Sequence, residues 1–118
     1  MFNGKKAAEQ SVAEFHKLYN DSKLTEIYSA SHTKLKGATK EKQFVELEEA
    51  VLRKLGKVTT TANKGFNVRT FNLTTTVALV QETTFEHGTG RETFTFEMEG
   101  EKAVLVGYKI NSRELVLK

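Results

Sequence analysis

Apolar residues in the first half of the chain recur at the spacing of amphipathic helices. The first stripe predicts a helix over residues 6–19, and it consists of Ala8, Val12, Phe15 and Tyr19. A shorter apolar triplet predicts a second helix over residues 23–31. The residues from Ser31 to Thr39 are polar and include Gly37, so we expect a connection there.

The third predicted helix has the clearest boundaries. Thr39 is its expected N-cap, and its body ends at Leu55. Gly56 follows where a left-handed C-terminal cap is needed, and Arg53 and Lys54 in the last turn suit the helix dipole. The expected apolar stripe of this helix is Phe44, Leu47, Val51 and Leu55.

After Gly56 the pattern changes to the two-residue alternation of strands, rich in threonine, valine and phenylalanine. The predicted strands cover residues 57–71, 75–86, 91–99 and 102–111. Glycine-containing turns, His87 to Gly90 and Glu99 to Glu101, separate the last three of them. On the third strand Phe94, Phe96 and Met98 are expected to point inward, and on the fourth the residues expected to share one face are Val104, Val106, Tyr108 and Ile110.

Helices followed by an antiparallel meander predict an α+β domain. We expect three N-terminal helices packed on a curved antiparallel sheet of about four strands, with a cone-like cavity between the layers. Residues 1–118 are expected to form one domain, because a chain of this length builds one core. The candidate residues for lining a ligand pocket in the cone are Phe15, Tyr19, Tyr28, Phe44, Phe96 and Tyr108.

Composition removes several kinds of chemistry. The chain has no cysteine, so disulfides, thiolate metal sites and cysteine nucleophiles are excluded. His16, His32 and His87 show no metal-ligand spacing, and Asp21 is the single aspartate. We therefore assign no metal ligand, no cofactor and no catalytic residue.

The net charge of +3 lies entirely in residues 1–57, which hold 11 basic and 8 acidic residues. This charge is too small for a nucleic-acid-binding face, and aromatic residues do not interleave with the lysines. Lys34, Lys36, Lys40 and Lys42 form either a solvated loop or, with Lys5 and Lys6, a contact for an anionic membrane surface or an acidic partner.

The predicted strands also carry many threonines and three notable carboxylates. Threonine is common on sheet faces that are partly exposed to solvent. The threonine-rich face is therefore expected to be either open to solvent or covered by a partner or a second copy of the chain. Catalysis in a cone would need an acid or base inside an apolar pocket, and the sheet offers Glu82, Glu92 and Glu97. Glu82 and Glu97 share mixed or threonine-rich faces, and exposure there explains both.

Four segments carry a resemblance to a known superfamily: Leu52 to Val58, Val77 to Gly88, Arg91 to Phe94 and Gly107 to Ser112. With the element order, they make the chain resemble small bacterial domains of unknown function in the nuclear-transport-factor-2-like, or cystatin-like, superfamily. Such domains are often exported or lipid-anchored. The resemblance implies the cone-like fold, a place in the cell envelope or periplasm, and a flexible tether over residues 1–5. Without it, the cytoplasm is the default compartment.

We therefore expect a non-catalytic binding or protein-interaction module, in the bacterial cell envelope if the resemblance holds. The alternative is a small-molecule enzyme of isomerase or cyclase type that uses a carboxylate in the cone. The expected partner is an unknown protein or a small apolar ligand, and not a nucleic acid. Peripheral membrane contact and a homodimer through the sheet stay open.

Overall fold

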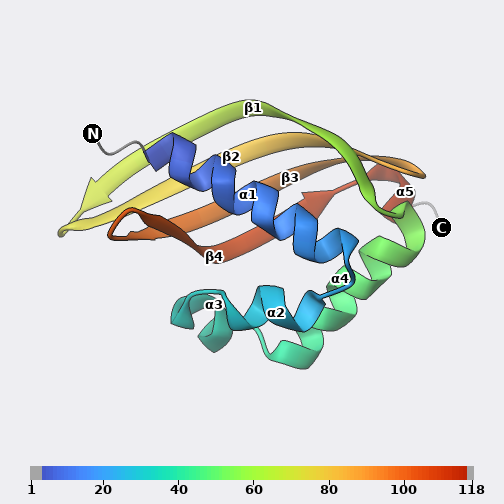
Figure 1. Cartoon of the computed structure of the whole chain (residues 1–118), viewed down its shortest axis with the longest axis horizontal. Coiled ribbons are helices and arrows are strands. Elements are labelled where there is room, and N and C mark those ends of the chain that lie inside the picture. Colours follow the sequence, from blue (N-terminus) through green and yellow to red (C-terminus); the bar gives the residue numbers. More distant parts are fainter. Residues whose placement is uncertain (1–3, 117–118) are drawn as a thin grey trace.

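The strands follow one another in space in the same order as in the sequence (Figure 1). A computed structural model describes residues 4–116, and its four-stranded sheet is antiparallel throughout. This confirms the α+β class and the four-stranded meander. The strands are β1 (Val58–Phe71), β2 (Thr74–Phe85), β3 (Gly88–Glu99) and β4 (Lys102–Asn111).

The helices are gathered on one side of this sheet. Figure 1 shows α1 crossing one face of the strands, whereas α2 and α3 lie beyond β4. None of the helices described over residues 4–116 is long and apolar enough to cross a membrane. The helices are α1 (Gly4–Asn20), α2 (Leu24–Ser29), α3 (Thr33–Ala38), α4 (Glu41–Leu55) and α5 (Arg113–Val116).

Four helices, and not the three expected, precede the sheet in the described part of the chain. The predicted polar connection contains α3, because the His32 ring accepts a hydrogen bond from the Lys34 amide (3.0 Å) and Leu35 is buried. Thr39 therefore ends α3, and Lys40 is the N-cap of α4. Residues 1–3 of the expected tether lie outside the described residues, and its last two residues belong to α1.

Helix α4 buries Phe44, Val51 and Leu55 of the predicted apolar stripe, but it buries Glu48 in place of Leu47. Leu47 is 45% exposed, whereas its neighbour Glu48 is completely buried. Phe44, Glu48, Val51 and Leu55 are the buried residues of this helix, spaced i, i+4, i+7 and i+11. A carboxyl group therefore occupies a core position that we had assigned to leucine.

A register shift in the pairing of β3 with β4 corrects the predicted face of the last strand. Thr95 pairs with Gly107, whereas Phe96 pairs with Leu105, so β4 has one extra residue at this point. The shift puts Leu105 on the buried side, and Ala103 is buried too. Val104 and Val106 are therefore not on the face of Tyr108, although Phe94 and Phe96 point inward as predicted.

Strand β1 forms one edge of the sheet and extends past the helices. All of its residues are exposed or half-buried. Its turn to β2 lies at one end of the long axis, farther out than the helices (Figure 1). At this turn Asn72 and Leu73 have φ angles of 51° and 67°, in the left-handed region that two-residue hairpin turns require. Leu73 is also fully exposed.

The turn gives a first prediction, for Leu73→Gly. Glycine adopts a positive φ without the Cβ clash of leucine, so we expect the free energy of unfolding to rise by about 0.5–1 kcal/mol. Urea unfolding followed by circular dichroism measures this change. Leu73→Ala removes the exposed side chain but keeps the Cβ, and it should leave stability nearly unchanged. Equal stabilisation by both variants would show that backbone strain is not the cause.

Candidate functional site

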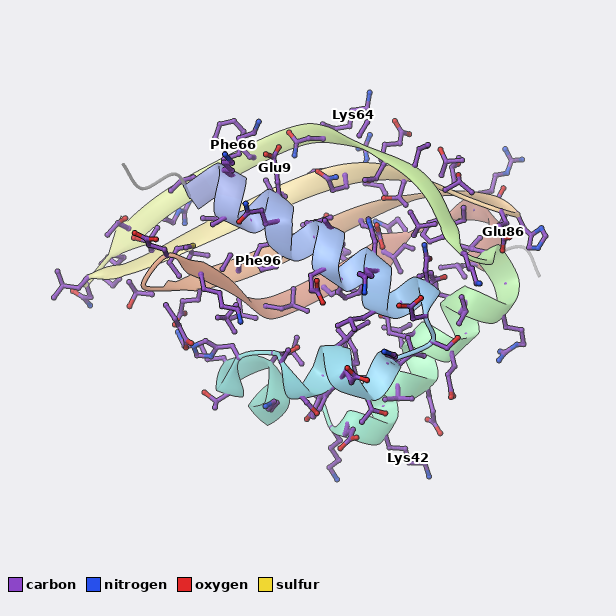
Figure 2. The ribbon with its side chains drawn as sticks, viewed as in Figure 1. Glu9, Lys42, Lys64, Phe66, Glu86 and Phe96 are labelled. Carbon is purple, nitrogen blue, oxygen red and sulfur yellow. The ribbon has the colours of Figure 1, made fainter. Side chains whose placement is uncertain are left out.

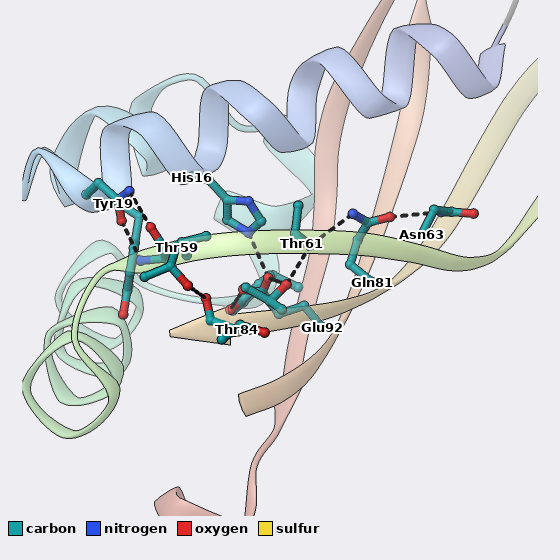
Figure 3. A network of polar contacts seen from close by, with 12 residues as sticks. His16, Tyr19, Thr59, Thr61, Asn63, Gln81, Thr84 and Glu92 are labelled. Carbon is teal, nitrogen blue, oxygen red and sulfur yellow. Dashed lines mark hydrogen bonds and ion pairs between the residues drawn. The ribbon is translucent and has the colours of Figure 1, made fainter. Parts of the chain in front are cut away.

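A cluster of buried polar side chains lies between α1 and the inner face of the sheet (Figure 3). At its centre is Glu92 of β3, which is 1% exposed. Its Oε1 accepts hydrogen bonds from His16 Nε2 and Thr83 Oγ1, each at 2.7 Å. Its Oε2 accepts one from the Tyr108 hydroxyl. Three donors from α1, β2 and β4 therefore meet on one carboxylate, which is a pure acceptor when ionised.

This cluster continues to the exposed edge of the sheet. Thr83 gives its proton to Glu92, so Thr61 of β1 must be the donor in the 2.8 Å contact between the two threonine hydroxyls. Gln81 Nε2 donates to Thr61 (3.1 Å), and Asn63 Nδ2 donates to Gln81 Oε1 (2.8 Å). Every donor in this row points toward Glu92 (Figure 3).

Glu48 is a second carboxyl group in the same core. Neither of its oxygens has a hydrogen-bond partner among the described residues. Burial raises the pKa of Glu48 to about 8, and the negative charge of Glu92 adds to the shift. Burial, with the charges of these two glutamates, also raises the pKa of the Tyr19 and Tyr108 hydroxyls. The Glu48 carboxyl is therefore mostly protonated at neutral pH, and both phenols keep their protons.

Aromatic rings pack directly around the cluster. The Phe15 ring stacks on Tyr108 with centroids 4.7 Å apart, and it meets Phe94 edge-on at 5.1 Å. A groove of about 110 Å³ lies nearby, with walls that include Phe15, Ile27, Phe96 and Leu105. Neither Glu48 nor Glu92 lines it. Ligand sites usually measure about 300–1,000 Å³, so this groove is small for one.

The six residues predicted to line a pocket are divided between several places. Phe15 and Phe96 line the small groove. Tyr108 belongs to the Glu92 cluster, and Tyr19 is buried with its hydroxyl donating to the Gly56 carbonyl (2.7 Å). Tyr28 and Phe44 lie together elsewhere, with ring centroids 5.7 Å apart. The Tyr28 hydroxyl donates to the Thr39 carbonyl at 2.7 Å.

Of the three strand carboxylates considered from the sequence, Glu92 alone is in the core, whereas Glu82 is exposed. Sequence reasoning did not find His16 and Glu48 as members of this cluster. A signal for His16 was present, because it lies four residues after Val12 and three before Tyr19 on the buried side of α1.

A second feature lies on the outer face of the sheet, the face opposite Phe94 and Phe96. A hollow of about 330 Å³ opens there beside the β1–β2 turn. Hydrogen bonding to the Lys34 ammonium lowers the pKa of Glu97 in its wall, and His32 Nε2 is 3.1 Å from Glu97 Oε1. The hollow is lined by Lys34, Arg69, Phe71, Asn72, Thr74, Thr76 and Glu97.

Exposed apolar side chains lie along β1 on both faces of the sheet: Phe71 lines the hollow, whereas Phe66 and Val68 are on the inner face. On β1, Phe66, Val68 and Phe71 are 54%, 45% and 74% exposed. Figure 2 shows Lys64 and Phe66 at the margin of the molecule that β1 forms, far from Lys42 on α4. Apolar side chains this exposed on an edge strand are a feature of surfaces that bind other chains.

Within residues 4–116 no three histidine or carboxylate side chains are placed to share a metal ion. Comparison with protein-family models and with curated proteins gave no match for this chain.

Proposed function

We propose that this protein is a non-catalytic interaction module that binds an extended segment of a partner protein along the free edge of β1. In such strand addition, backbone hydrogen bonds provide affinity and alternate side chains provide specificity. The observation that carries the proposal is β1 itself, a 14-residue edge strand with no buried residue.

The two edge strands, β1 and β4, differ in how many of their outward backbone groups are hydrogen-bonded to the rest of the protein. On β4, the Leu105 carbonyl accepts from the His32 amide (2.8 Å) and the Ala103 carbonyl accepts from the Ser11 hydroxyl (2.7 Å). On β1, the Asn20 side chain bonds both backbone groups of Val58. From residue 59 to 71, β1 has no backbone hydrogen bond to a described element other than β2. Within residues 59–71 the Gly65 carbonyl accepts from Asn63 Nδ2 (3.2 Å), but from residue 66 to 71 no described residue outside β2 bonds the β1 backbone, so its outward amides and carbonyls there can pair with another strand.

The second half of β1 is the more suitable segment. Bulges and lysines commonly protect edge strands from pairing. Register shifts occur between Val58 and Thr60 and between Asn63 and Gly65, next to Lys64. From Phe66 to Phe71 the pairing with β2 is regular, and apolar side chains are exposed. We therefore place the docking segment at residues 66–71.

The resemblance to nuclear-transport-factor-2-like domains supports two further parts of this proposal. The first is a cone-like arrangement of the helices on the sheet. The second is a place in the bacterial cell envelope, where an exposed strand edge would meet secreted or anchored partners. A homodimer through the sheet is an outcome that the experiment below distinguishes.

A display selection tests strand addition. A library of random 12-residue peptides is selected on the immobilised protein, and bound peptides are mapped by amide hydrogen exchange. We expect selected peptides to slow exchange in residues 66–71, because the outward amides become hydrogen-bonded.

Phe66→Glu and Val68→Lys each put a charge into the docking segment and should reduce binding. Leu47→Lys puts a charge on an exposed position of α4, away from β1, and should not. Absence of binders, or protection only at the groove beside Phe15, would contradict strand addition.

One observation favours the alternative of a small-molecule enzyme. A buried histidine beside a buried carboxylate, with a neutral carboxyl group nearby, is a combination suited to acid and base chemistry. This alternative requires an opening that exposes Glu92. In this structure Phe15 and Phe94 pack around the cluster and close it. Entry of xenon or a small aromatic probe into the core would change the NMR chemical shifts of His16, and such a change would support the enzyme alternative.

A further inference from the structure

We propose that the partner strand carries an acidic residue opposite Arg69, and that its carboxylate pairs with the Arg69 guanidinium at the rim of the hollow. This inference rests on the proposed function, and it names the chemical class of the segment that β1 selects. The partner is an extended segment of another protein in which the acidic side chain lies on the outer face and apolar side chains lie on the inner face.

The strand register places Arg69 in a cross-strand row. Arg69 pairs with Thr76 of β2, and Thr76 pairs with Glu97 of β3. These three side chains therefore share the outer face, and all three line the hollow. An added strand would continue the row on the free side of Arg69, and directly opposite residues have Cβ atoms about 4.5–5.5 Å apart. One side chain of the partner must then lie next to the Arg69 guanidinium.

Charge decides which side chain fits. Glu97 already pairs with the Lys34 ammonium and has His32 Nε2 3.1 Å away, and Lys64 Nζ lies 3.9 Å from Glu82 Oε1. Arg69 has no ion pair with any residue in the described part of the chain. A guanidinium binds a carboxylate through two parallel hydrogen bonds, so an acidic residue matches this position best.

The sequence of β1 argues against a second copy as the occupant. The segment Val58–Phe71 contains Lys64 and Arg69 but no acidic residue. A homodimer formed by pairing β1 with itself would place a neutral or basic residue opposite Arg69. A segment of a different protein is therefore the better complement.

The apolar positions define the rest of the preferred segment. Phe66 and Val68 pair with Leu79 and Val77, so they lie on the inner face. Phe71 pairs with Thr74 and lies on the outer face, two residues from Arg69. A strand with apolar residues facing Phe66 and Val68, and an acidic residue between them and Phe71, satisfies each position.

The test uses three 12-residue display libraries that are identical except for one fixed central residue, which is Glu, Gln or Lys. We expect the wild-type protein to enrich the Glu library. A synthetic peptide from it should bind about 5- to 10-fold more weakly after Glu is replaced by Gln. Arg69→Gln should abolish this difference, and Arg69→Glu should shift enrichment to the Lys library. Lys64→Gln is the matched control on the same strand and should keep the preference.

The outcomes separate this inference from the function on which it rests. If peptides protect residues 66–71 but bind equally with Glu or Gln, the acidic preference is wrong and strand addition stands. If a peptide keeps its preference for Glu with the Arg69→Gln variant, a different basic side chain binds the carboxylate, and the assignment to Arg69 is overturned. If sedimentation shows a dimer that Phe66→Glu dissociates, a second copy occupies the edge. If no peptide protects β1, strand addition itself fails.

Discussion

Glu92→Gln is expected to lower the free energy of unfolding by roughly 3 kcal/mol, because it breaks a buried, charge-assisted network. The amide keeps the size of the side chain but replaces one acceptor oxygen with a donor group. His16 and Thr83 share Oε1, and Tyr108 bonds Oε2, so at least one of these donors would lose its acceptor. Urea unfolding at pH 7 measures the loss, and it is followed by far-ultraviolet circular dichroism because the chain has no tryptophan for fluorescence.

Two comparisons make this result specific. Tyr108→Phe removes one donor and leaves the carboxylate with His16 and Thr83, so a loss of about 1 kcal/mol is expected. Glu82→Gln makes the same chemical change at an exposed strand position, and its effect should stay within about 0.5 kcal/mol. If Glu92→Gln were as mild as Glu82→Gln, the cluster would contribute little to the stability of the fold.

Glu48→Met is expected to have the opposite effect and to stabilise the protein at neutral and alkaline pH. Methionine fills a similar volume without a polar group that lacks a hydrogen-bond partner. The pKa of Glu48 is about 8 in the folded state and 4.5 for an ordinary glutamate. The folded protein therefore holds a proton that the unfolded chain releases as pH rises above 4.5.

The sign of the pH dependence follows from this difference. Below pH 4.5 both states are protonated at Glu48, and the group adds no pH-dependent penalty. As pH rises from 4.5 to about 8, wild-type stability should fall by on the order of 4 kcal/mol from this group and then level off. The gap between Glu48→Met and wild type should widen over the same range.

Urea unfolding at several pH values between 5 and 9 measures the gap. Glu49→Met, the same substitution at the next and exposed position, is the control and should give a nearly constant difference. A gap for Glu48→Met that stays constant with pH would mean that Glu48 is already ionised in the folded protein at pH 5. Its side chain would then need a partner that this structure does not show.

Much of the element order could be predicted because it depends on local periodicity. The alternation around Phe94 and Phe96 gave β3 and its inward face, and the stripe ending at Tyr19 gave α1. Short α3 was missed because its cap is a histidine side chain, which is outside the usual set of capping residues.

The candidate site could be predicted only in part. Whether Leu47 or Glu48 faces the core depends on how α4 is rotated against the sheet, and tertiary packing sets this rotation. The one-residue shift in β4 likewise depends on its pairing with β3, and no single-strand pattern contains it. The exposed edge could be recognised only when the strand order showed that β1 is the last strand on its side.

The hydrogen-bonded row from Asn63 to Glu92 has a consequence for the pairing of two repetitive strands. Threonine faces threonine near both ends of this hairpin, at Thr60–Thr84 and Thr61–Thr83 and at Thr70–Thr75, so these pairs do little to distinguish one alignment from the next. A slip by one residue would turn Thr61 and Asn63 to the outer face. Thr83 and Gln81 would then lose their partners inside the core. The polar row thus penalises misaligned hairpins and selects a single β1–β2 alignment during folding.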